Sequence, residues 1–304
     1  MISFLQIDLP ALLVGTLAAT VCALIGNFLV LTRQSMLGDA MGHVVLPGIV
    51  IAFVLAGTTA TWAMLTGAFA AALFSAFLVE FFRRTARIDA SAALGSVFTA
   101  MFALGVLLLE QSGVARTSFD VHHILFGNIE TAIWPAATGL SSLFDPVALA
   151  SLPPQLGRLA FGLVIVALVV IALFKELRVV SFDPDFARTI GISPQLIGAV
   201  IVSLAALAAV VSLSAVGVIL LVAMMVCPPA TARMLTDDLK TQVWLSLLFA
   251  LASGVLGYAI AVLLPLAFGY EISFGAAGTI AVVAGLFQLA AMLFGAKRGM
   301  PKTA

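Results

Sequence analysis

An aspartate and a histidine four residues apart are the side chains of this sequence best suited to bind a cation. Asp39 and His43 lie in GDAMGHVVLPG, residues 38–48, within an apolar stretch. On a helix this spacing places both side chains on one face, about 6 Å apart at Cβ. A carboxylate and a neutral imidazole so placed can hold one divalent cation between them. Because ionisable residues inside a membrane span mark function, the pair predicts metal or proton chemistry.

The same segment also has a purely structural explanation. Asp39 would cap the beginning of a helix, and His43 would donate a hydrogen bond to a neighbouring carbonyl. Two ligands do not complete a metal site, so other helices or a symmetric second copy must supply the rest. Gly38 and Gly42 lack side-chain bulk, which favours the close approach of another helix. Pro47 leaves a backbone carbonyl without its helical partner.

Further histidines and carboxylates are expected at the external ends of the helices, where an acidic rim attracts cations. The candidates for metal entry are His122, His123, Glu110 and Glu271. An exposed loop pair and ordinary interfacial carboxylates are the simpler explanations of these residues.

A polar segment, residues 176–194, predicts a small capped helix outside the bilayer. Asp183 and Pro184 form an N-cap and first-turn pair, and Gly191 suits the position after the last turn. The expected helix of about seven residues is too short to span a membrane. It is suited to dock into a soluble partner, although an ordinary surface turn fits the composition equally well.

The composition requires a membrane bundle to position these segments. Hydrophobic residues make up 63% of the 304 residues and charged residues 9%, with a mean hydropathy of +1.23. A soluble domain carries about 25% charged residues. The apolar runs are continuous rather than alternating, which excludes a membrane β-barrel. We therefore predict an all-α, polytopic transmembrane helical bundle that forms a single domain, residues 1–304.

Nine apolar segments are long enough to cross a bilayer core of about 30 Å, which needs about 20 helical residues. They are 9–31, 40–57, 60–82, 91–110, 156–174, 195–213, 215–233, 242–264 and 273–294. Pro47 lies in the second segment, which is therefore expected to be short, broken or kinked. The long interruption 111–154 is expected to form an external or re-entrant connection.

The basic residues predict the orientation of the bundle, because Lys and Arg concentrate on the cytoplasmic side of membranes. With nine spans, all but two of the 14 lie on one side, the exceptions being Arg116 and Arg158. This places the C-terminus in the cytoplasm and the N-terminus outside. The 14 basic and 14 acidic residues balance, so nothing indicates nucleic-acid binding.

Four stretches in a fixed order together resemble the integral-membrane permease of metal-type ABC importers, the family that takes up manganese, zinc or iron. They are LTRQSMLGDAMGHVVLPGIVIAF, SFDPDFARTIGI, VGVILLVAMMVCPPATARMLTDDL and the Gly-rich last third around SGVLGYAIAV. The patterns GDA-x-x-H-x-x-LPG and D-x-x-x-A-R-x-x-GI are specific in combination. The resemblance covers most of the chain apart from 131–155, which is longer than the usual connection. His122 and His123 depart from the family, whose members often carry acidic residues there.

The resemblance implies that Asp39 and His43 line the translocation path as metal ligands, and that a second permease, either a copy of this chain or a paralogue, completes the site. It implies that 178–194 is a cytoplasmic coupling segment seated on a separate ATP-binding subunit. The coupling residues are Asp183, Pro184, Asp185, Phe186, Ala187, Arg188 and Gly191. An extracytoplasmic metal-binding protein would deliver the ion, and the location would be the bacterial cytoplasmic (inner) membrane.

Carboxylate and imidazole suit transition ions better than Mg²⁺ or Ca²⁺. Among these ions the transported metal is expected to be Mn²⁺, with Zn²⁺ or Fe²⁺ next, because hard oxygen is prominent and thiolate is absent. This ion is cargo, so no tightly bound cofactor is expected. The chain has no G-x-x-x-x-G-K-[ST] phosphate loop, so we expect it not to be an enzyme and assign ATP hydrolysis to another subunit. The alternative is a proton-coupled secondary cation transporter with Asp39 and His43 as a proton relay.

Overall fold

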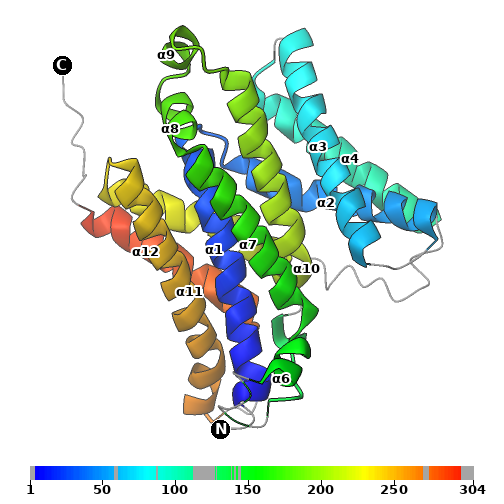
Figure 1. Ribbon diagram of the computed structural model, residues 1–304, viewed down its shortest axis with the longest axis vertical. Helices are drawn as coiled ribbons and strands as arrows, with labels where there is room; N and C mark the ends of the chain where they lie inside the picture. Colours follow the sequence, from blue (N-terminus) through cyan, green and yellow to red (C-terminus); the bar gives the residue numbers. More distant parts are fainter. Residues whose placement is uncertain are drawn as a thin grey trace.

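The chain folds into an all-α bundle of long apolar helices (Figure 1). The computed structural model describes residues 4–57, 61–86, 88–111, 127, 129–137, 139, 142, 145–269 and 274–295. Within these ranges there is no strand, and eight helices are long and apolar enough to cross a membrane. The prediction of a polytopic helical bundle is confirmed.

The described elements begin with a π-helical turn and include one 3₁₀ turn. In chain order they are η1 (Phe4–Asp8), α1 (Leu9–Leu31), α2 (Met36–Ala56), α3 (Thr61–Thr85), α4 (Ala90–Gln111), η3 (Ile129–Thr131), α6 (Pro146–Ala150), α7 (Pro154–Ala172), α8 (Phe174–Phe182), α9 (Pro184–Thr189), α10 (Pro194–Leu235), α11 (Leu239–Ala267) and α12 (Ala276–Phe294).

Helix α1 is the central element of the bundle and contacts α7, α10 and α11 (Figure 1). A helix that is apolar on every side is stable only when other helices surround it or lipid does. Other helices surround α1, since Ile25, Phe28 and Leu29 are fully buried. The other long helices leave more apolar side chains at the surface, where a bilayer would cover them.

A buried polar network fixes α1 against α11. The Nδ2 of Asn27 donates hydrogen bonds to Ala23 O at 2.8 Å and to Ser246 Oγ at 2.6 Å. Asn27 Oδ1 in turn accepts a hydrogen bond from Gln242 Nε2 at 3.2 Å. Asn27, Gln242 and Ser246 are all fully buried. Because polar groups in an apolar interior need partners, this network specifies the register of the two helices.

Helix α10 contains two of the predicted spans, 195–213 and 215–233, in one element of 42 residues. That length corresponds to about 63 Å, twice the thickness of a bilayer core. The helical geometry is interrupted at Gly217, whose φ of 74° and ψ of 174° are not helical. The described chain therefore has eight candidate spans where the sequence predicts nine, because two of the predicted segments are joined in this one kinked element.

Helix α2 is longer than predicted and is helical on both sides of Pro47. It begins at Met36 rather than near residue 40, and runs across the long axis of the bundle (Figure 1). The expected break at Pro47 does not occur. The proline ring instead meets Gly105 of α4, where an added Cβ would lie 2.8 Å from Pro47 Cδ. The missing side chain of Gly105 thus makes room for the proline inside the helix pair.

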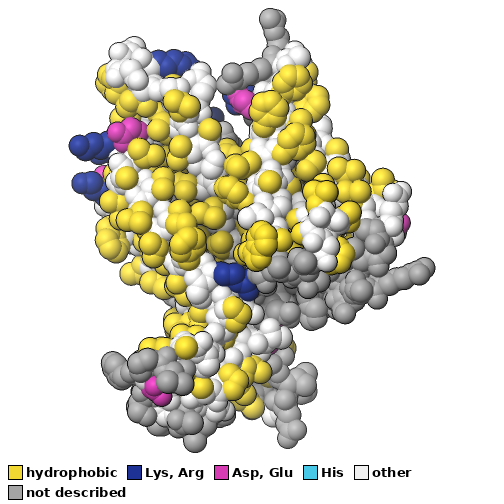
Figure 2. Space-filling view, turned by 45° about the vertical axis from the view of Figure 1, so that its right-hand side comes forward, with side chains coloured by type: hydrophobic (Ala, Val, Ile, Leu, Met, Phe, Trp, Pro, Cys, Tyr) yellow, Lys and Arg dark blue, Asp and Glu magenta, His cyan; other side chains and the backbone are white. Residues whose placement is uncertain are grey.

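The surface of the molecule matches a membrane environment. Figure 2 shows hydrophobic side chains spread over the middle of the bundle, with Lys and Arg side chains mainly toward the end that carries α8 and α9. Two tryptophans, Trp62 at the start of α3 and Trp244 near the start of α11, are 71% and 74% exposed. Tryptophans are enriched at membrane–water interfaces, where an apolar ring and a polar N–H are both accommodated.

A small folded layer precedes α7 at the end of the bundle where the chain begins (Figure 1). Its core is Trp134, which is 1% exposed and donates through Nε1 to Ala148 O at 2.8 Å. The backbone N–H of Trp134 donates to Gln6 O at 2.8 Å, and Gln6 Nε2 donates to Ala137 O at 2.9 Å. These contacts tie the layer to the turn η1. It forms the described part of the predicted connection 111–154.

Candidate metal site and coupling helix

Asp39 and His43 lie one turn apart in the first half of α2, as their spacing predicts. The Oδ1 of Asp39 is 3.6 Å from Nε2 of His43. Two metal–ligand bonds of about 2.1 Å that meet at a tetrahedral angle place their donor atoms about 3.4 Å apart. The two side chains therefore already face each other at a separation that fits one shared cation.

The purely structural roles suggested for the two residues, a helix cap for Asp39 and a hydrogen bond to a carbonyl for His43, do not match the geometry. Helix α2 begins at Met36 with Ser35 as its N-cap, so Asp39 lies inside the first turn and does not cap the helix. Among the described residues, the contact with Asp39 is the one polar contact of His43, which makes no hydrogen bond to a carbonyl. Both side chains remain available to a ligand, with His43 28% and Asp39 44% exposed.

Glycines on α2 let α10 approach the pair closely, as predicted. A Cβ on Gly38 would lie 2.8 Å from Met225 Sδ, and a Cβ on Gly42 would lie 3.0 Å from Val218 Cγ1. Both contacts come from the half of α10 that follows Gly217. The candidate site is therefore packed against the helix segment that begins at the kink.

Two phenylalanines of α4 surround the imidazole of His43. The ring of Phe98 is stacked on it, with centroids 5.7 Å apart and an interplanar angle of 24°. The ring of Phe102 meets it edge-on at 5.3 Å and 77°. The sequence gives no signal for this contact, because phenylalanines in an apolar helix are unremarkable until the neighbouring helix is known.

One chain alone supplies only part of a metal site. In the part of the chain that the structure describes, no group of three or more His, Cys, Asp or Glu side chains is placed to hold a metal ion. Asp39 and His43 alone would therefore supply two of the ligands that a bound cation needs. Closed metal sites need about four ligands.

One of the four predicted entry residues lies in the part of the chain that the structure describes. His122, His123 and Glu271 lie outside the described residues. Glu110 is exposed near the end of α4. Sequence reasoning missed two other carboxylates: Asp8 accepts a hydrogen bond from the hydroxyl of Tyr258 at 2.8 Å, and Glu130 accepts one from the first N–H of α12, at Ala276. Their partners are more than 140 residues away along the chain.

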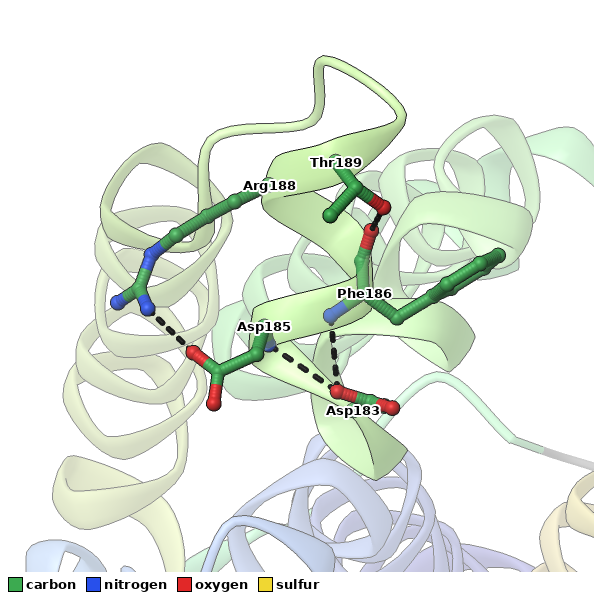
Figure 3. Close-up of polar contacts among 5 residues, drawn as sticks. All are labelled: Asp183, Asp185, Phe186, Arg188 and Thr189. Atoms are coloured by element: carbon green, nitrogen blue, oxygen red, sulfur yellow. Dashed lines mark hydrogen bonds and ion pairs between the residues drawn. The ribbon is translucent and has the colours of Figure 1, made fainter.

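Helix α9 has the caps that the sequence predicts (Figure 3). Asp183 Oδ1 accepts hydrogen bonds from the backbone N–H groups of Asp185 at 3.1 Å and Phe186 at 2.9 Å. After the helix, Gly191 has a φ of +81°, a conformation that favours glycine. Arg188 forms an ion pair with Asp185 on the same face.

One face of α9 is anchored and the other is open. Ala187 is fully buried, whereas Phe186 is 53% exposed. Its neighbour α8 is held to the far end of α10, since the Arg233 guanidinium lies 5.5 Å from the ring centroid of Phe182. Such cation–π contacts link a charged end to an aromatic face. Nearby, Asp238 caps α11, and hydrogen bonds from the N–H and hydroxyl of Thr241 lower the pKa of its carboxyl.

Comparison with protein families supports a single assignment for nearly the whole chain. The model of the ABC 3 transport family matches residues 4–133 and 147–295. The interval 134–146 that it leaves unmatched begins at Trp134 and lies inside the stretch 131–155 that is longer than the usual connection. The Trp134 layer is therefore partly built from residues outside the family pattern.

Individual proteins show the same similarity. The chain is 36% identical over 286 residues to the manganese transport system membrane protein MntD of Bacillus subtilis, covering 94% of this chain and 91% of MntD. It is 34% identical over 242 residues to the zinc transport system membrane protein TroC of Treponema pallidum, covering 80% and 76%. The solved structure of PsaBC from Streptococcus pneumoniae in complex with Fab has a TM-score of 0.71 at 28% identity, covering 94% and 91%.

Proposed function

The chain belongs to the ABC 3 transport family as a metal-type ABC permease, and from this membership we propose that it is the membrane-spanning subunit of an ATP-driven importer of divalent transition metal, most specifically Mn²⁺. Zn²⁺ and Fe²⁺ are the next candidates. The observation that carries the proposal is the Asp39–His43 pair, whose donor atoms are 3.6 Å apart. The name of MntD supports manganese, and the name of TroC supports zinc.

Ion transfer through the pair requires ligands that bind briefly. An external binding protein delivers the cation, and Asp39 and His43 replace part of its water. A second permease copy contributes its own aspartate and histidine, which completes the shell that one chain leaves open. The exposed fractions of 44% and 28% support such sharing, because neither side chain is enclosed within its own chain. Shared ligands release an ion more readily than a closed cage does.

Coupling to ATP hydrolysis takes place through α9, which seats on a separate ATP-binding subunit. The exposed ring of Phe186 and the Asp185–Arg188 pair form the surface that the partner contacts. The proposed orientation places α9 and the C-terminus in the cytoplasm, and places the Trp134 layer outside the bacterial inner membrane.

A continuous set of contacts leads from α9 to the metal ligands. Helix α8 joins α9 to the end of α10 through Phe182 and Arg233. The same half of α10 meets α2 at Gly38 and Gly42, directly beside Asp39 and His43. We propose that movement of α9 reaches the ligands along this half-helix, which the kink at Gly217 separates from the rest of α10.

Substitution of the carboxylate tests the proposal. Cells that lack the protein are complemented with wild type or with Asp39→Asn, and their manganese, zinc and iron contents are measured by mass spectrometry. Wild type is expected to restore one metal. Asp39→Asn is expected to reduce the uptake of this metal by about 10-fold or more. Loss of a residue that only supports a metal ligand already lowers metal affinity or activity by about 10-fold or more, and loss of a ligand itself should cost at least as much.

The matched control is Glu80→Gln, which removes a carboxylate of similar exposure that pairs with Arg83 on α3. Equal amounts of each variant in the membrane fraction are confirmed by immunoblot. If complementation with wild type changes the cellular content of none of the three metals, the proposed importer function and the proposed substrate are both wrong. If uptake survives ATP depletion and collapses with the proton gradient, the proton-relay alternative is correct.

A further inference from the structure

We propose that Phe98 and Phe102 are positioning and specificity residues for the Asp39–His43 pair. They hold the imidazole in a fixed orientation and exclude cations that keep their water. The inference rests on the proposed function and deepens it, because it names the class of cation that the site rejects.

The first part of the argument is the orientation of the imidazole. Phe98 stacks on one face of the His43 ring, and Phe102 approaches it edge-on. Stacked and edge-to-face pairs at these distances are favourable geometries. They restrict rotation of the imidazole, so Nε2 stays directed toward the Asp39 carboxylate. A metal ligand whose ring is held in advance loses less freedom on binding.

The second part is the way in which α4 is fixed against α2. Phe98 and Phe102 are four residues apart and share one face of α4. Gly105 follows less than one turn later and meets the ring of Pro47, which lies one turn beyond His43 on α2. The contact between glycine and proline sets the register in which both aromatic rings reach the imidazole.

The third part is the chemistry of the space beside the imidazole. Mg²⁺ prefers octahedral oxygen coordination and keeps several waters, and Ca²⁺ takes six to eight oxygen ligands. Coordinated waters need hydrogen-bond acceptors, and the carbon atoms of two aromatic rings offer none beyond their weakly accepting faces. A transition ion that accepts an imidazole nitrogen and sheds water satisfies the site.

The two phenylalanines differ in how safely they can be changed. Phe98 is partly buried and packs on the cluster formed by Val44, Ala71, Val97 and Met101. Phe102 is 40% exposed, so its replacement removes less of the core. Phe102 is therefore the position to test.

The experiment measures Mn²⁺ binding by the complete transporter, with both permease copies, purified in detergent, with Mg²⁺ as competitor. The readout is the ratio of the Mg²⁺ concentration that displaces half of the Mn²⁺ to the Kd for Mn²⁺. In Phe102→Ala this ratio is expected to fall by about 10-fold or more, the size of effect typical of outer-shell residues of metal sites. A purely structural role would weaken binding of all ions without changing this ratio.

Two controls separate the ring from its bulk and from general destabilisation. Phe102→Leu keeps an apolar side chain in place and is expected to preserve the ratio to within about 3-fold, because the site still excludes water. Phe161→Ala removes a phenylalanine of α7 that is 67% exposed, and is expected to leave binding unchanged. The visible absorption of bound Co²⁺ is an independent readout, since four-coordinate Co²⁺ absorbs more strongly than six-coordinate Co²⁺.

The outcomes are distinct. If wild type binds no Mn²⁺, the proposed function fails and the inference fails with it. If wild type binds Mn²⁺ but Phe102→Ala discriminates against Mg²⁺ as well as wild type does, only the inference is overturned. It is also overturned if Phe102→Leu loses discrimination as fully as Phe102→Ala. Loss of discrimination in Phe102→Ala alone, together with weaker Co²⁺ absorption, supports it.

Discussion

Asp183 determines where α9 begins, because its carboxylate binds the first free N–H groups of the helix. A helix of six residues cannot sustain itself by propensity alone, since helix nucleation is unfavourable. Its stability therefore depends on single residues at its ends and on the buried contact of Ala187. The proposed ATP-binding partner would therefore depend on these few residues to keep α9 formed.

Removal of the cap is expected to loosen α9 without unfolding the bundle. Asp183→Ala deprives two N–H groups of their acceptor and costs the helix about 1 kcal/mol. Hydrogen exchange at the amides of 185–189 is expected to become faster, while exchange in α1 is unchanged. Asp183→Asn keeps an acceptor oxygen and should exchange nearly as slowly as wild type. Equal exchange in wild type and Asp183→Ala would contradict the role of the cap.

Between elements, the closest contacts are made where glycines take the place of side chains. Pro229 has no N–H to donate to Met225 O, the carbonyl that would be its helical partner in α10. This carbonyl is directed at Gly26 of α1, at the position that a Cβ would occupy. The paired prolines thus shape an approach that only glycine permits.

Addition of one methyl group at this contact is expected to destabilise the bundle. Gly26→Ala would force α1 away from Met225 and Pro229, at a cost of about 1–3 kcal/mol for overpacking. Gly285→Ala in α12 adds the same methyl where nothing lies within 4 Å, and is expected to be neutral or stabilising by about 0.5–1 kcal/mol. Thermal unfolding in detergent compares the two variants. A Tm of Gly26→Ala equal to that of wild type would show that α1 and α10 can move apart at this contact without loss of stability.

How much of each element the sequence predicts depends on how far apart along the chain the interacting residues are. Helix type, the Asp39–His43 spacing and the caps of α9 depend on neighbours within about four residues, and all of them are visible in the sequence. The course of α2 through Pro47 depends on Gly105 of α4, more than fifty residues away. The phenylalanines around His43 depend on the same helix pairing. In a chain this apolar, hydrophobic periodicity does not identify which faces meet.

In the whole molecule, the half of α10 that follows Gly217 contacts both α8, which precedes the proposed coupling helix α9, and α2, which carries Asp39 and His43. Arg233 contacts Phe182 of α8 at 5.5 Å and donates to Asp237 O at 3.1 Å. In the proposed coupling mechanism, a displacement of α9 would therefore reach α2 through this half of α10.

Loss of this junction is expected to uncouple ATP hydrolysis from uptake. In the complete transporter in proteoliposomes, Arg233→Gln removes the cation–π contact, worth about 0.5–1 kcal/mol, and leaves Asp39 and His43 in place. We expect ATP hydrolysis to continue while metal uptake per ATP falls, with Mn²⁺ affinity unchanged. Lys240→Gln removes a different basic charge, in the first turn of α11, and serves as the control. An unchanged ratio of uptake to hydrolysis in Arg233→Gln would exclude this route.

The three tryptophans give the molecule intrinsic optical probes of separate regions. Trp62 and Trp244 are open to their surroundings, so brominated lipids quench their emission according to their depth in the bilayer. Trp134 is shielded and hydrogen-bonded through its indole nitrogen, so its emission reports the layer that is partly built from residues outside the family pattern. When two of the three tryptophans are replaced by phenylalanine, the emission wavelength and the quenching of the remaining indole report on one region at a time, without an attached dye.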